Sequence, residues 1–123
     1  MAYFSQAAYE TLLQKVRAAD TADDLEIIRD ASDDFIQYVR VVSEGESRLN
    51  TAVSPDRSMV GDYDAKRHNA HENAISSVSV LNRLAAMYGT DPVYSGDTAE
   101  RHQVAAFCLE LVSFLFINRR KVL

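Results

Sequence analysis

The chain has 123 residues, of which 47% are hydrophobic and 25% are charged, as in a single globular domain with a hydrophobic core. Its 4 glycines and 2 prolines leave few positions for the many turns of an all-β fold. The formal net charge of -5 opposes binding to the phosphate backbone of nucleic acids.

The sequence also contains signals for the cellular compartment in which the protein is found. A single cysteine cannot form an internal disulfide, and the apolar neighbours of Cys108 predict a buried, reduced thiol. The N-terminus lacks the basic region of a secretory signal peptide. The most apolar stretch, residues 104–117, is too short to span a membrane and contains Glu110. We therefore expect a soluble, cytoplasmic protein with no membrane partner.

The first predicted helix covers residues 5–19. Apolar side chains recur at helical spacing from Ala8 through Leu12 to Val16, which places them on one face. Ser5 is a residue type suited to cap the N-terminus.

The second predicted helix begins at Thr21 and ends before Ser54, because Pro55 opposes a helical residue in front of it. Gly45 lies within the segment and predicts a bend or a break there. The apolar stripe consists of Leu25, Ile28, Phe35, Val39, Val42, Leu49 and Val53.

The third predicted helix covers residues 62–88, and Gly89 is suited to end it in the left-handed conformation. The fourth opens at Asp97 as N-cap with Glu100 at the third helical position, and it continues nearly to the end of the chain. The last two helices are each about 40 Å long at the usual rise.

The fourth helix is apolar almost all round, since only Glu110 and Ser113 are polar between residues 104 and 117. Such a helix either lies at the centre of a bundle or forms an oligomer interface. We therefore predict an all-α, single-domain, up-down four-helix bundle over residues 1–123, with the fourth helix central and a homodimer as the assembly.

The start of the third helix is unusual because ionisable residues occupy it. Asp64, His68 and Glu72 share one edge at helical spacing, whereas Arg67 and His71 share another. The second edge continues the apolar stripe of the same helix. We therefore expect Arg67 and His71 to face a partner helix.

Three interpretations of this polar cluster stay open. If the second and third helices form a hairpin around Pro55, then Glu44, Glu46 and Arg48 lie opposite the cluster. A structural network then joins Arg67 and His71 to acidic groups of the second helix. Alternatively, histidines and carboxylates bind a divalent metal, although the known two-helix metal motifs are absent. In the third interpretation, Arg67 or Arg48 binds an anion.

No catalytic motif is present, and His102 is predicted to be a surface histidine near Leu84, far from His71. The absence of such motifs, together with the excess of apolar helix surface, favours a non-enzymatic interaction or regulatory protein without a cofactor. The alternative is a metal- or anion-binding bundle, including an enzyme, whose polar site is the cluster at Arg67 and His71.

One stretch resembles a known family. It combines Arg67, His71 and Glu72 with the apolar spacing that leads to Asn82 and Arg83, and the segment from Gly96 and Asp97 to Arg101 adds to it. This stretch resembles the central helix of a bacterial family of small helical proteins without an assigned function. The resemblance implies a small helical fold and transfers no activity.

Overall fold

The computed structural model describes residues 2–51 and 57–118, with side chains described at residues 2–47 and 59–118. Helix α1, Gln6–Ala18, begins at the predicted cap, because the Ser5 hydroxyl accepts a hydrogen bond of 3.2 Å from the backbone N–H of Ala8. Leu12 and Val16 on the predicted stripe are buried. The first helix is thus confirmed to within a residue at each end.

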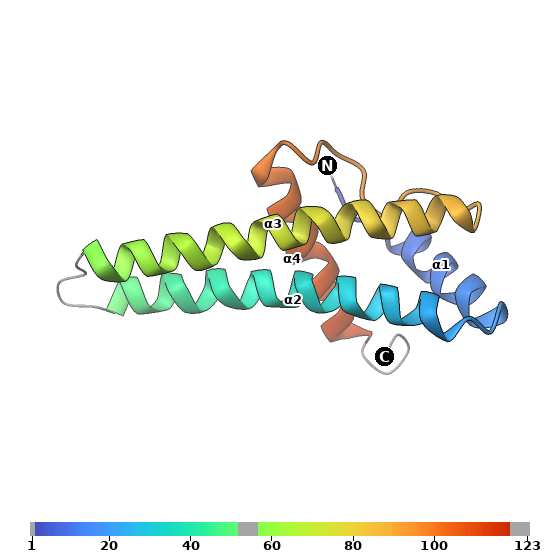
Figure 1. Ribbon diagram of the computed structural model, residues 1–123, viewed down its shortest axis with the longest axis horizontal. Helices are drawn as coiled ribbons and strands as arrows, with labels where there is room; N and C mark the ends of the chain where they lie inside the picture. Colours follow the sequence, from blue (N-terminus) through green and yellow to red (C-terminus); the bar gives the residue numbers. More distant parts are fainter. Residues whose placement is uncertain (1, 52–56, 119–123) are drawn as a thin grey trace.

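Helices α2, Ala22–Thr51, and α3, Arg57–Met87, form a long antiparallel hairpin (Figure 1). The predicted bend or break at Gly45 is wrong, because α2 continues through this residue. The reason lies on the neighbouring helix: the ring of Tyr63 packs so closely on Gly45 that a Cβ atom would overlap it. Gly45 thus makes room for a side chain of α3.

Helix α3 begins five residues earlier than predicted and ends one residue before the predicted end. Its last turn is followed by Gly89, whose φ of 68° is the left-handed conformation that glycine adopts without strain. The backbone N–H of Thr90 donates to the carbonyl of Ala85, which satisfies one of the last helical carbonyls.

Helix α4, Arg101–Ile117, begins later than predicted. The Asp97 carboxylate accepts a hydrogen bond of 2.9 Å from the N–H of Ala99, so it stabilises a local turn in place of a helix start. Glu100 is the N-cap residue instead. With 17 residues, α4 is about 25 Å long, so the predicted length of about 40 Å is wrong for this helix.

The arrangement of the helices has one main feature: α4 crosses the α2–α3 hairpin, while α1 packs at one end of it (Figure 1). The rings of Phe4, Phe35 and Tyr94 surround Phe107 of α4, with centroids 5.0–5.8 Å away. Phe114 of α4 contacts Tyr9 of α1. These contacts join α1, α2 and α4, and the buried Val78 and Leu81 of α3 belong to the same core. Within the described residues the predicted all-α class is confirmed.

Two polar side chains connect the N-terminal segment and the loop before α4 to this core. Asn82 accepts hydrogen bonds from the N–H groups of Val93 and Tyr94 and donates to the Tyr94 carbonyl. Glu110, the one charged residue in the apolar stretch of α4, accepts from the N–H groups of Tyr3 and Phe4 at 3.0 and 2.8 Å. Both residues therefore satisfy backbone groups that are far away in the sequence.

Candidate functional site

The polar cluster of α3 is divided by its surroundings. Asp64, His68 and Glu72 are exposed, as expected for an edge that faces water. His71 is buried, with 3% of its surface exposed, and its ring lies 5.8 Å from that of Tyr38 on α2. The prediction that His71 faces a partner helix is therefore confirmed.

Arg67 lies half-buried one turn before His71. Its guanidinium forms an ion pair of 3.9 Å with Asp64 on the same helix. The predicted connection of Arg67 to acidic groups of α2 is therefore wrong for the described side chains. A pair this long, with both side chains accessible to solvent, contributes little to stability.

The register of the hairpin explains this outcome. The hairpin forms as predicted, but His71 lies opposite Tyr38, at nearly the same distance from the connection between the helices. Glu44 lies farther along, beside Tyr63 and Lys66. The acidic residues of α2 are thus displaced from His71 by more than one helical turn. Arg48 lies in α2, but its side chain falls outside the described residues.

The electrostatic surroundings of His71 favour its neutral form. Burial lowers the pKa of the imidazole most, and the positive charge of Arg101 lowers it further. Glu72 opposes these effects, whereas Arg67 and His68 add to them. The Nε2 atom of His71 is buried without a hydrogen-bond partner, a rare state for a polar atom in a folded protein.

A metal centre is not assembled in the described part of the chain. No group of three or more histidine, cysteine, aspartate or glutamate side chains there could hold a metal ion. The physical reason is the division of the cluster: His71 is buried against Tyr38, whereas Asp64, His68 and Glu72 are exposed. The four predicted ligands therefore do not share one site.

Tyr38 and Arg101 complete the surroundings of His71, and the sequence reasoning missed both. Tyr38 had a signal, because it follows the buried Phe35 by three residues on α2. Arg101 had none, because only the crossing of α4 over the hairpin brings its charge to act on His71 and Tyr38.

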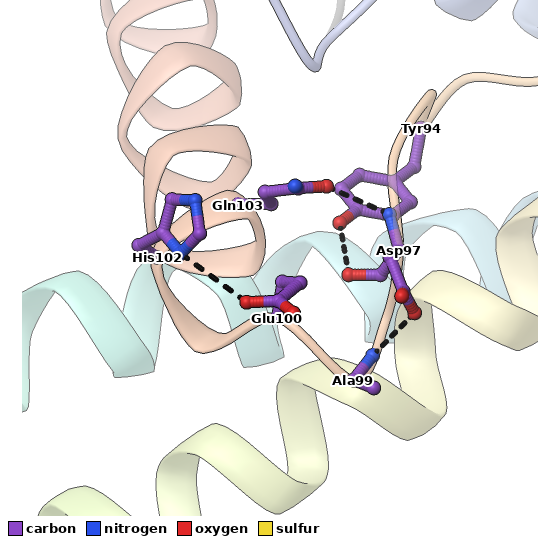
Figure 2. Close-up of polar contacts among 6 residues, drawn as sticks. All are labelled: Tyr94, Asp97, Ala99, Glu100, His102 and Gln103. Atoms are coloured by element: carbon purple, nitrogen blue, oxygen red, sulfur yellow. Dashed lines mark hydrogen bonds and ion pairs between the residues drawn. The ribbon is translucent and has the colours of Figure 1, made fainter.

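His102 is a surface residue, as predicted, with 71% of its side chain exposed, and it pairs with Glu100 at 3.7 Å (Figure 2). Its predicted location near Leu84, far from His71, is wrong. The neighbouring Arg101 acts on His71, because α4 starts beside the middle of α3 (Figure 1).

The loop before α4 holds the first turn of α4, which carries Arg101, in place. The Tyr94 hydroxyl donates to the Asp97 carbonyl at 2.9 Å, and the N–H of Asp97 donates to the Gln103 side chain at 2.8 Å (Figure 2). Tyr94 is itself buried against Phe107. The position of Arg101 relative to α3 is therefore set by a hydrogen-bonded loop anchored in the core.

A cleft of about 190 Å³ lies between α2 and α3 beyond the crossing with α4. It is lined by Val41, Glu44, Gly45, Met59, Asp62, Tyr63 and Lys66. None of these residues is buried, so the cleft offers no desolvated polar group that would select a ligand.

The side of α4 that faces away from the core forms a second candidate region, which we call the outer face of α4. Leu109, Phe116 and Ile117 are 55%, 72% and 82% exposed there. The helix is therefore not enclosed at the centre of a bundle. The outer face consists of the exposed Leu109, Ser113, Phe116 and Ile117 and the half-buried Ala105 and Ala106, of which Ala105 also packs against the core at its edge.

Comparison with known proteins identifies the family but no activity. The family model described as "Protein of unknown function (DUF3232)" matches residues 5–121. The chain belongs to this family. The resemblance to a family without an assigned function is thus confirmed, while the bacterial origin stays a prediction. No curated protein and no solved structure matches the chain. Within the described residues, no helix has the length and hydropathy needed to cross a bilayer.

Proposed function

We propose that this protein is a non-enzymatic helical interaction protein that acts through the outer face of α4. One observation carries the proposal: Leu109, Phe116 and Ile117 are exposed on a helix that has no charged residue on that face. Contiguous exposed apolar side chains on a soluble domain mark surfaces that another macromolecule covers. Both a second copy of this chain and a different protein meet that requirement.

A cytoplasmic location accords with this proposal. Cys108 is a free cysteine, and cysteines stay reduced in the cytoplasm.

Site-specific photo-cross-linking tests the proposed surface. A benzophenone amino acid at position 113, in the middle of the outer face, should give a discrete cross-linked species in cells that express the protein. The same probe at the exposed position 76 of α3 is the matched control and should give none. The variant Phe116→Asp should abolish the species, whereas Met87→Asp, at an equally exposed apolar side chain on α3, should not.

Two results would contradict the proposal. The first is the absence of any cross-linked species at position 113, and the second is the same species at positions 113 and 76.

A second candidate function is the binding of a small anion at the crossing of α3 and α4. The observation in its favour is the buried Nε2 atom of His71, which has no hydrogen-bond partner and is influenced by the charges of Arg67 and Arg101. Two guanidinium groups provide the charge that an oxyanion requires, and a neutral imidazole can donate one hydrogen bond. A metal ion is not part of this candidate, because the described residues contain no set of ligands for it.

Thermal unfolding in inorganic phosphate at constant ionic strength tests the anion site. The melting temperature of the wild-type protein should rise with phosphate, and the double variant Arg67→Gln/Arg101→Gln should lose that rise. Arg83→Gln, at an exposed arginine of α3, is the control and should keep it. An equal rise in all three proteins would contradict specific binding.

A further inference from the structure

The outer face of α4 is uncharged along its whole length, which restricts the kind of partner. Glu110, the nearest charged residue on the same helix, is occupied with the backbone N–H groups of Tyr3 and Phe4. His102, before the face, is paired with Glu100. A partner recognised by its charge therefore finds no counter-charge here, and the face suits an apolar surface of similar shape.

The side chains on this face change in size from one end to the other. Ala105 and Ala106 lie at its N-terminal end, whereas Phe116 and Ile117 lie at its C-terminal end. Both pairs are equally far from Leu111 in the sequence. Leu109 and Ser113, one large and one small, also lie equally far on either side of it.

This distribution is self-complementary for one arrangement of two copies. In an antiparallel pair with a two-fold axis at the level of Leu111, Phe116 and Ile117 of one copy lie over the alanines of the other, and Leu109 lies over Ser113. Because the axis is two-fold, each of these contacts occurs two times in the dimer. A parallel pair would instead stack the large side chains on each other and leave the alanines without a partner, which is poor packing.

We propose that a second copy of this chain covers the outer face of α4, with the two α4 helices antiparallel about a two-fold axis at the level of Leu111. The inference rests on the proposed function and names its partner. One helix of about 25 Å contributes a smaller interface than a typical obligate dimer. A small interface favours a dimer that dissociates on dilution.

Analytical ultracentrifugation of the full chain tests the self-association. The mass should rise with concentration from the monomer value of 13.8 kDa toward twice that value. Phe116→Asp should weaken the dimer at least about 30-fold, the effect of removing a large apolar hot-spot residue, which the two-fold axis removes on both copies. Met87→Asp, which alters a side chain with the same exposed fraction of 72%, should leave the dissociation constant unchanged. Circular dichroism verifies that both variants are folded.

Disulfide trapping tests the antiparallel orientation. A mixture of the variants Ala105→Cys and Ile117→Cys should form a mixed disulfide under mild oxidation, while each variant alone should form little dimer. Like-with-like disulfides would indicate a parallel pair and overturn the proposed arrangement. The native Cys108 does not interfere, because it is buried in the core.

The outcomes separate the two proposals. A monomer at all concentrations, or a dimer that Phe116→Asp leaves unchanged, overturns the self-association. If the photo-cross-linked species at position 113 then has the mass of a different protein, the proposed function stands without the second copy. If position 113 also gives no species, both proposals fail.

Discussion

The two ends of the α2–α3 hairpin show how covering by other helices decides which residues are buried. At the end near α1, Ile28 and Phe35 of α2 and Leu81 of α3 are fully buried in the core that the hairpin shares with α1 and α4. At the other end, which we call the distal end and define as residues 41–47 and 59–67, the two helices have only each other (Figure 1). None of these distal residues is buried.

This difference explains the change in composition along α3. A pair of helices without a third layer covers less of each side chain in its seam, so apolar residues there gain less free energy from burial. The stripe of α3 is accordingly apolar at Ala74, Val78 and Leu81, where α4 covers it, and becomes ionisable at Arg67. His71 marks the boundary, because it is still buried and already ionisable.

The largest predicted effect tests the covered end. Phe107→Ala should lower the free energy of unfolding by about 3–5 kcal/mol, because its fully buried ring contacts Phe4, Phe35 and Tyr94. Tyr63→Ala at the distal end is the comparison and should cost about 1 kcal/mol or less. Urea unfolding monitored by circular dichroism measures both. Equal losses would show that the two ends contribute alike.

The next largest effect concerns Asn82, which holds the loop before α4 on the end of the hairpin that α1 and α4 cover. Asn82→Ala should lower the free energy of unfolding by about 2–3 kcal/mol, because it leaves backbone groups of the buried residues Val93 and Tyr94 without partners. Asn82→Asp keeps both accepted hydrogen bonds and loses the donated one, so it should retain more stability than the alanine variant. Identical unfolding midpoints for the two variants would disprove this role.

A smaller effect compares two glycines of the hairpin. Gly61→Ala should raise the free energy of unfolding by about 0.5–1 kcal/mol, since an added methyl group meets no atom there. Gly45→Ala should gain less or lose stability, because the Tyr63 ring must move away. In the background of Tyr63→Ala, the alanine at position 45 should recover the gain. A double-mutant cycle from thermal unfolding measures this coupling.

The smallest predicted effect concerns His71, at the boundary between the two ends, and the pH dependence of stability. Because burial and the charge of Arg101 hold the pKa of His71 below its usual 6.5, the unfolded chain binds a proton before the folded one as the pH falls. The free energy of unfolding should therefore decrease as the pH falls below about 6.5 and should level off below the folded-state pKa. Chemical unfolding between pH 7.5 and 5.5 should show a smaller decrease for His71→Gln. Parallel profiles would contradict a buried, neutral imidazole.

The amino-acid sequence by itself determined the helical class, the cap at Ser5, the stop at Gly89 and the burial of His71. Each depends on side-chain spacing or backbone chemistry within a few residues, so a local pattern carries the information.

Only the tertiary structure decided that α2 continues through Gly45, that His71 lies opposite Tyr38 and that the charge of Arg101 acts on both. These features depend on how Phe107 and its aromatic neighbours, which are far apart in the sequence, pack α4 across the hairpin. The free energy of that packing belongs to the contact between helices, and no single segment of the chain contains it.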